Sequence, residues 1–246
     1  TSSSWGCSVK STSRRAMKPE AELQVFEKLG GTFVTPIHTL VERARTIRGL
    51  VADWDGVFNQ GAKGEGASST YSEPDSMGTN LLRYSLWRKH GELPIAALIT
   101  GADNPSARTF AVREHFHAIY FGSRNKTAAI EALCRTDGCS SDRLVCMFDD
   151  VNDLGMAFAC GIRVYVQRSA SPLLREYVVR QGLCDYVTAH SAERHAVREV
   201  CELLLGLLGA FDAVVASRVA WDRDYAAYFT PRQAVVTELV DQRAMD

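Results

Sequence analysis

The sequence lacks three features that would direct it to a membrane, to nucleic acid or to an oxidising compartment. Its apolar runs fall short of the roughly 20 residues that a membrane-spanning helix needs. Lys and Arg (28) balance Asp and Glu (29), so no excess charge favours nucleic acid or anionic lipid. The 7 cysteines are an odd number without metal-ligand spacing, which indicates thiols in a reducing compartment. We therefore expect a cytoplasmic protein that binds neither nucleic acid nor membrane.

The first 19 residues differ from the rest of the chain in composition. They carry basic side chains but no acidic one, and they are rich in Ser. An organelle transit segment has this composition, and so has a disordered or tag-like tail, and both interpretations remain open. The whole chain of 246 residues, 46% of them hydrophobic, is long enough for one large or two small globular domains.

From residue 20 onward, helix and strand signals alternate. Apolar runs typical of buried strands lie at 50–52, 95–99, 118–121, 144–148, 162–166 and 185–188. Helix signals lie at 20–29, after Thr35-Pro36, at 76–90, after Asn104-Pro105 and at 126–135. Strands that alternate with helices predict an α/β fold with a doubly wound parallel sheet. Residues 56–74, rich in Gly and Ser, predict a loop or a hairpin flap.

Polar side chains follow the predicted strands or begin the next helix. In chain order they are Asp53, Asp55, Thr100, Gly101, Lys126, Asp149, Asp150 and Asp153. Because right-handed crossovers leave the carboxyl ends of parallel strands at one edge of the sheet, we expect these side chains to meet there.

The chemistry of this group points to phosphoryl transfer. Carboxylates at such density are costly to crowd together unless a cation compensates them, and oxygen ligands favour Mg²⁺. The Thr100 hydroxyl, the Gly101 N–H and the Lys126 ammonium suit a phosphate. A carboxylate is one of the nucleophiles that proteins use for covalent catalysis. The sequence therefore predicts a metal-assisted reaction of a phosphate at this edge.

The motifs resemble those of haloacid dehalogenase superfamily phosphatases. They are Asp53-Trp54-Asp55-Gly56, Thr100-Gly101, Lys126, and Asp149-Asp150 with Asp153, in the family's order. The chain most resembles the 3-deoxy-manno-octulosonate 8-phosphate phosphatases and the modules attached to CMP-sialic acid synthetases. The resemblance covers about 48–208, leaving a helical extension at 20–47 and a C-terminal helical extension at 209–246.

The resemblance implies a role for each residue that reacts with or binds the phosphate. Asp53 would be the nucleophile and would form an aspartyl-phosphate. Asp55 would protonate the leaving oxygen and later deprotonate the attacking water. Thr100, Gly101 and Lys126 would bind the phosphoryl group.

The resemblance also implies a Mg²⁺ cofactor. Asp53, Asp149 and the backbone carbonyl of Asp55 would be its protein ligands. Asp153 would ligate the metal or orient the residues that do so, and Asp150 is expected to be structural rather than a ligand.

The spacing of the motifs leaves no room for a lid domain. Asp53 and Thr100 are 47 residues apart, and Lys126 and Asp149 are 23 apart. Domains begin at roughly 50 residues, so the active site is predicted to be open. Resemblance to the capless members implies a homotetramer, in which flaps pack together and neighbouring subunits close each site.

Two segments depart from the resembling sugar-acid phosphatases. Ala102 stands where they carry Arg after Thr-Gly, and 191–195 replaces a glycine-rich segment. Both departures concern substrate recognition. Arg194, His195 and Arg198 could contact the substrate of a neighbouring subunit, or they could form a solvated helix start.

Two classes of function remain. The first is a Mg²⁺-dependent phosphatase that acts on a small phosphorylated metabolite, such as a sugar or sugar-acid phosphate. The second is a non-catalytic or weakly active oligomerisation module associated with nucleotide-sugar synthesis, as the resemblance to CMP-sialic acid synthetases suggests. The presence of both Asp53 and Asp55 favours the first class.

Overall fold

A computed structural model describes residues 19–64 and 69–244. The predicted N-terminal tail lies outside the described residues except for Pro19, and so do residues 65–68 of the predicted flap. Residues 56–64 and 69–72 form a loop, and one isolated bridge joins Asp55, just before it, to Asn59. Residues 73–74 of the predicted flap belong to the helix that begins at Glu73.

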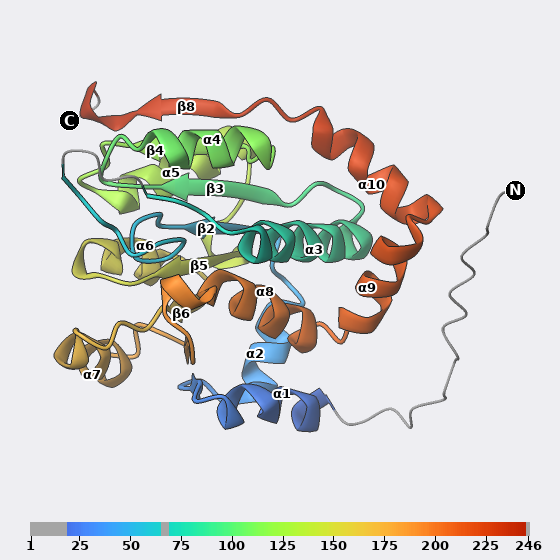
Figure 1. The fold of residues 1–246 in the computed structure, drawn as a ribbon, viewed down its shortest axis with the longest axis horizontal. Coiled ribbons are helices and arrows are strands. Elements are labelled where there is room, and N and C mark those ends of the chain that lie inside the picture. The colour runs from blue at the N-terminus through green and yellow to red at the C-terminus, as the bar shows by residue number, and fades with distance from the viewer. Residues whose placement is uncertain (1–18, 65–68, 245–246) are drawn as a thin grey trace, which may run out of the picture.

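One eight-stranded sheet organises the described residues (Figure 1), in the order β1-β7-β6-β5-β2-β3-β4-β8. The strands are β1 (Thr32–Phe33), β2 (Gly49–Ala52), β3 (Ile95–Ile99), β4 (Ala118–Phe121), β5 (Leu144–Phe148), β6 (Ile162–Tyr165), β7 (Tyr186–Val187) and β8 (Glu238–Asp241). The pairing is parallel except between β1 and β7. The predicted α/β class with a doubly wound parallel sheet is confirmed. The edge strands β1 and β8, which lie in the two extensions, were not predicted.

Most helices of the described residues lie on the two faces of the sheet (Figure 1). They are α1 (Pro19–Lys28), α2 (Ile37–Ala44), α3 (Glu73–His90), α4 (Pro105–Arg113), α5 (Lys126–Asp137), α6 (Leu154–Ala159), α7 (Pro172–Arg180), α8 (Ala196–Leu207), α9 (Phe211–Ala220) and α10 (Arg223–Gln233). Short 3₁₀ turns occupy Ser141–Arg143, Val151–Asp153, Ala192–Arg194 and Gln242–Ala244.

Side-chain caps start several helices where the sequence predicts them. The Asn104 side chain accepts from the Ser106 N–H at the start of α4, as expected from Asn104-Pro105. The start of α2 differs from the prediction, because Pro36 is the capping residue and no side chain caps the helix. Thr35 instead donates its hydroxyl to Asp185 at 2.6 Å, which ties the N-terminal extension to the sheet.

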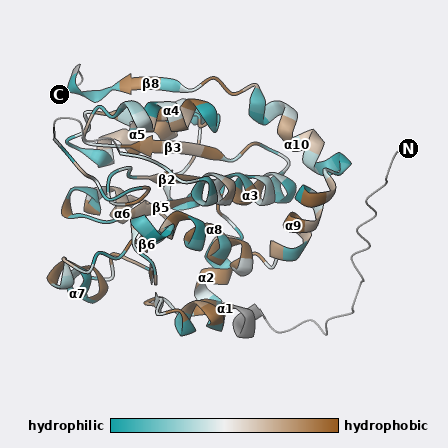
Figure 2. Ribbon diagram, viewed as in Figure 1, coloured by the Kyte–Doolittle hydropathy of each residue, from teal (hydrophilic) through white to brown (hydrophobic). Residues whose placement is uncertain are grey.

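The core lies on both faces of the central strands, and Figure 2 shows β3 in the colour of hydrophobic residues. Leu50 and Ala52 of β2 belong to one apolar cluster, which includes residues of α8. Val51 points the other way, into a second cluster that includes residues of α5 and α6. Because successive side chains of a strand alternate between faces, a doubly covered strand must be apolar throughout. This explains why β2 reads as a continuous apolar run before Asp53.

The C-terminal extension packs against α3 through aromatic side chains. Tyr225 and Tyr228 of α10 are buried beside Tyr84 of α3, with Tyr84–Tyr225 and Tyr84–Tyr228 ring centroids 5.0 and 5.3 Å apart. The chain then returns along the sheet, and β8 pairs with β4. The aromatic residues of the extension therefore form a third apolar cluster with α3 and α8, beside the two clusters on the sheet.

In the part of the chain that the structure describes, no single helix is long and apolar enough to cross a membrane. The pair α8 and α9 meets the criteria of length and composition only when taken together, and it is bent by 111°.

Candidate active site

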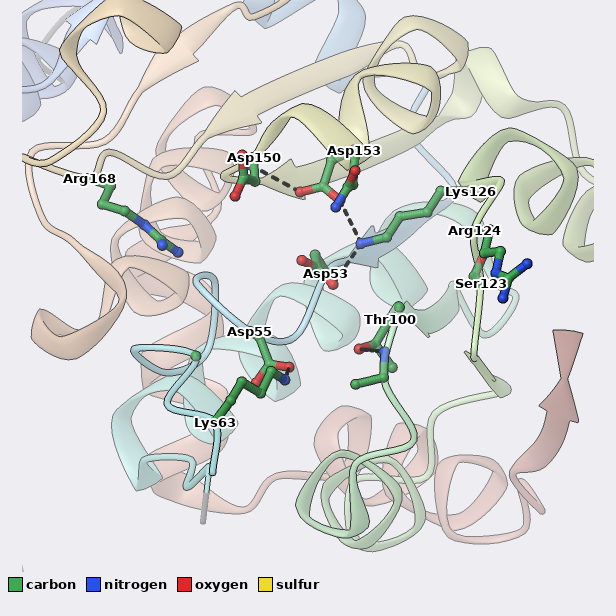
Figure 3. Close-up of a pocket in the computed structure, with 14 residues that line it drawn as sticks. Asp53, Asp55, Lys63, Thr100, Ser123, Arg124, Lys126, Asp150, Asp153 and Arg168 are labelled. Atoms are coloured by element: carbon green, nitrogen blue, oxygen red, sulfur yellow. Dashed lines mark hydrogen bonds and ion pairs between the residues drawn. The ribbon is translucent and has the colours of Figure 1, made fainter. Parts of the chain in front are cut away.

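The sheet brings the predicted residues to one edge, as expected. Ala52 of β2 lies level with Leu98 of β3 and with Met147 of β5, so the residues that follow these strands emerge side by side. A cavity of about 530 Å³ opens there (Figure 3). Its lining includes Asp53, Asp55, Thr100, Gly101, Lys126, Asp150 and Asp153.

A buried lysine bridges two of the carboxylates. The Lys126 ammonium lies 2.7 Å from Asp53 Oδ1 and 2.5 Å from Asp153 Oδ1, and all three residues are buried. The Asn125 side chain caps α5 and so fixes the position of the lysine at its first turn. Burial alone would lower the pKa of Lys126, but the two carboxylates outweigh it and raise that pKa. The lysine therefore stays charged next to Asp53.

Asp153 organises the turn that follows β5. Its Oδ2 accepts the backbone N–H groups of Asp149 and Asp150 at 3.3 and 3.2 Å. The Asp150 carboxylate instead caps the next turn, where it accepts the Val151 N–H at 2.7 Å. The residue is exposed. Asp153 thus holds both the lysine and the acidic turn in place.

Three buried carboxylates, those of Asp53, Asp149 and Asp153, can offer oxygens within 4.8 Å of one another. Burial, together with Asp53, raises the pKa of Asp149 to about 8. Burial also raises the pKa of Asp53 to about 6, although Lys126 opposes the shift. Asp149 Oδ1 is buried without a hydrogen-bond partner among the described residues, while its Oδ2 pairs with Arg168. An orphaned carboxylate oxygen in a crowded acidic cluster fits a divalent cation.

The loop after β2 reaches this cluster only because residue 56 is a glycine. Gly56 has φ of +96°, and a Cβ there would overlap Asp149 Oδ2. The same loop carries Asp55, which accepts from the Asn104 side chain at 3.4 Å and pairs with Lys63. Asp55 therefore borders the cavity away from the lysine bridge (Figure 3).

The end of β3 supplies polar groups on another side of the cavity. The Thr100 N–H donates to the Tyr120 carbonyl at 2.8 Å, and Thr100 is buried. Its Oγ1 accepts the Ala102 N–H at 3.4 Å, which turns the chain around the exposed Gly101. The arrangement places a hydroxyl and a glycine backbone on the cavity wall, as the sequence predicts.

Three predicted substrate contacts do not line this cavity. His195 Nδ1 lies 2.9 Å from Ser72 Oγ, and Arg198 pairs with Glu202 at 2.7 Å. Both residues lie at the start of α8, next to Arg194 in the preceding 3₁₀ turn. A role for them across a subunit boundary remains a prediction.

The structure adds cavity residues that sequence reasoning missed. They are Lys63, Ser123, Arg124, Asn152 and Arg168. Arg168 and Arg124 come shortly after β6 and β4, so the rule that strand ends meet at one edge could have found them. Lys63 lies in the irregular loop, where no sequence signal indicates its direction.

Comparison with known proteins shows which enzymes this chain resembles. No family model matches the chain. The 3-deoxy-D-manno-octulosonate 8-phosphate phosphatase of Yersinia pestis is 29% identical over 171 residues, which are 68% of this chain and 83% of that protein. The corresponding phosphatase of Salmonella typhi is 29% identical over 195 residues, covering 76% of this chain and 96% of that protein.

Solved structures of related phosphatases and hydrolases also resemble this chain. A haloacid dehalogenase superfamily hydrolase from Legionella pneumophila matches with a TM-score of 0.62 and 26% identity, over 74% of this chain and 95% of that one. The chain resembles haloacid dehalogenase superfamily hydrolases in both sequence and fold. The octulosonate phosphatase of Moraxella catarrhalis, solved with magnesium, phosphate and its sugar acid, matches with a TM-score of 0.61 and 25% identity, over 72% of this chain and 97% of that one. The curated relatives identify the enzyme class as a phosphoric monoester hydrolase.

The raised pKa of Asp149 predicts that this carboxyl destabilises the metal-free protein near neutral pH. Between pH 3.8 and about 8 the folded protein keeps a proton that the unfolded chain releases, so stability falls as pH rises through this window. Asp149→Asn should therefore exceed the wild type in stability at pH 8 in EDTA, and the difference should shrink towards pH 4. Urea denaturation measures both values.

The matched control is Asp212→Asn, an exposed carboxyl on α9, which should show no such trend with pH. An Asp149→Asn protein that is less stable than the wild type throughout the pH range would contradict the prediction.

Proposed function

We propose that the protein is a Mg²⁺-dependent phosphatase that hydrolyses a small sugar or sugar-acid phosphate through an aspartyl-phosphate on Asp53. The observation that carries the proposal is the buried cluster of Asp53, Asp149 and Asp153, with Lys126 between two of its members. A carboxylate cannot readily approach an anionic phosphate unless positive charge neutralises both. The lysine supplies part of that charge.

Asp53 would act as the nucleophile in the first step of the reaction. One of its oxygens would attack phosphorus while the bond to the leaving oxygen breaks, and Asp55 would protonate that oxygen. Asp55 would then take a proton from the water that hydrolyses the aspartyl-phosphate, which releases phosphate and regenerates Asp53. Thr100 Oγ1, the Gly101 N–H and the Lys126 ammonium would hold the phosphoryl oxygens. The positions of Asp53 and Asp55 on one loop, at different sides of the cavity, support this division of roles.

The proposed metal ligands are Asp53, Asp149 and the backbone carbonyl of Asp55. The partnerless Asp149 Oδ1 supports the assignment. When bound, Mg²⁺ neutralises charge and polarises the phosphoryl group. Asp153 is better suited to orientation, because its oxygens already serve Lys126 and two backbone N–H groups. Asp150, exposed and used as a cap, is proposed to be structural.

The substrate class rests on the size of the cavity and on the relatives. The cavity suits a small metabolite, and the curated relatives are named for a sugar-acid phosphate. We also propose a cytoplasmic location, because the six cysteines in the described part of the chain are free thiols.

Replacement of the two loop carboxylates tests the mechanism. Asp53→Asn should abolish hydrolysis of p-nitrophenyl phosphate, because the amide is not a nucleophile. Asp55→Asn should lose roughly the 10²- to 10⁴-fold that general acid–base catalysis contributes. Asp212→Asn is the matched control and should keep wild-type kcat. Near wild-type turnover by Asp53→Asn would rule out the covalent mechanism.

Removal of the metal tests the cofactor. Hydrolysis should vanish after dialysis against EDTA and return when Mg²⁺ is added, because Lys126 and Arg168 together cannot neutralise the three buried carboxylates and a phosphate. The measurement is the initial rate at increasing free Mg²⁺. Undiminished hydrolysis after thorough chelation would remove the metal from the mechanism.

The open cavity supports a homotetramer with sites bordered by two chains. An uncovered site admits water, which weakens the electrostatic stabilisation of a phosphoryl group. Lys63, on the loop beside the cavity, has a side chain 57% exposed that a partner subunit could cover. Light scattering at assay concentration should give about four times the 27.1 kDa of one chain. An active species of 27.1 kDa would show that one chain closes its own site.

A further inference from the structure

Four cationic side chains line the active-site cavity, and one of them differs from the others. They are Lys63, Arg124, Lys126 and Arg168. Lys63, Lys126 and Arg168 each form an ion pair with a carboxylate of the site. Arg124 forms no ion pair or hydrogen bond through its side chain within the described ranges 19–64 and 69–244, and it is exposed at the cavity. Its positive charge is available to a ligand.

Ser123, the residue before Arg124, also has a polar group available to a ligand. Ser123 is only 5% exposed, lines the same cavity, and its hydroxyl has no hydrogen-bond partner among the residues described. Its backbone N–H donates to the Thr100 carbonyl at 3.2 Å, so the turn is fixed beside the phosphate-binding end of β3. A buried hydroxyl without a partner is unfavourable unless a ligand or water completes it. Two adjacent residues thus offer donors to the same space.

The loop that follows β3 is hydrogen-bonded to this turn through Thr100 and brings a small side chain to the cavity. Ala102 lines the cavity, at the position where the resembling sugar-acid phosphatases carry Arg after Thr-Gly. Its methyl group leaves space between the ends of β3 and β4 for a part of the substrate. Figure 3 shows Ser123 and Arg124 on the side of Thr100 and Lys126, across the cavity from Arg168.

We propose that Ser123 and Arg124 form a specificity subsite for a carboxylate on the substrate, separate from the phosphate position. The proposal deepens the proposed phosphatase function and rests on it. A guanidinium presents two parallel N–H donors to a planar carboxylate, and the Ser123 hydroxyl adds a third donor. One uncompensated positive charge matches a monoanionic carboxylate. A second phosphate would bring roughly two negative charges to this turn, where Arg124 supplies a single positive charge.

The test compares ligands that differ only in the acid group. Phosphogluconate and sorbitol phosphate share a carbon skeleton, but only phosphogluconate carries a carboxylate. Isothermal titration calorimetry with the full-length Asp53→Asn protein and Mg²⁺ measures binding without turnover. We expect phosphogluconate to bind about tenfold more tightly than sorbitol phosphate, as a charge-assisted contact allows.

The variants show which residue recognises the carboxylate of the ligand. Arg124→Ala should bring the affinity ratio of the two ligands close to one, and Arg124→Lys should keep part of the preference because the charge remains. Ser123→Ala should reduce the ratio less than Arg124→Ala does. Arg135, an exposed arginine on the helix that follows Arg124, lies outside the cavity, so Arg135→Ala is the matched control and should leave the ratio unchanged.

Three outcomes would overturn the proposal. Equal binding of the two ligands by the Asp53→Asn protein would show that no acid subsite exists. An equal loss for both ligands in Arg124→Ala would assign the arginine to the phosphate instead. If fructose bisphosphate binds as tightly as phosphogluconate, and with the same dependence on Arg124, the subsite recognises a second phosphate and not a carboxylate. Hydrolysis of p-nitrophenyl phosphate by the wild type tests the proposed function separately, so the two can fail independently.

Discussion

The crowding of carboxylates at one edge of the sheet is the constraint on which the site depends. Asp53, Asp149 and Asp153 are buried within reach of one cation, and each charge raises the cost of the next. Lys126 relieves part of this repulsion by bridging Asp53 and Asp153, and Arg168 relieves another part at Asp149. Burial, together with the repulsion from Asp53 that remains, raises the pKa of Asp149, and this is the physical reason that the site suits a divalent cation.

The rigid centre of the fold holds this arrangement of charged residues in place. β2, which presents Asp53, lies between β3 and β5 and is buried along its whole length. An element held on both edges and both faces cannot move a charged residue away from its neighbours. The loop after β2 then passes so close to Asp149 that only a glycine fits at position 56. Glycine adopts this positive φ readily, so the loop can approach the carboxylate closely.

The two extensions show how sequence reasoning falls short at the edges of a sheet. The central strands were predictable because doubly covered strands must be apolar throughout. Thr32–Phe33 and Glu238–Asp241 are short and half exposed, so their pattern differs little from that of a loop. Their pairing with β7 and β4 depends on how distant segments pack, including the contact between Thr35 and Asp185. Nothing local in the sequence specifies such contacts.

The sequence by itself determined the α/β class, the central strands and the motif residues that reach the cavity, because strand ends of a parallel sheet share an edge. Asp53, Thr100 and Lys126 could be placed there from their positions alone. Only the tertiary structure decided the partners of each charge: that Asp153 holds Lys126 and the acidic turn, that Asp150 caps a turn, and that Arg124 has no acidic partner among the described residues. Pairing between side chains depends on directions and distances across elements, which spacing along the chain does not contain.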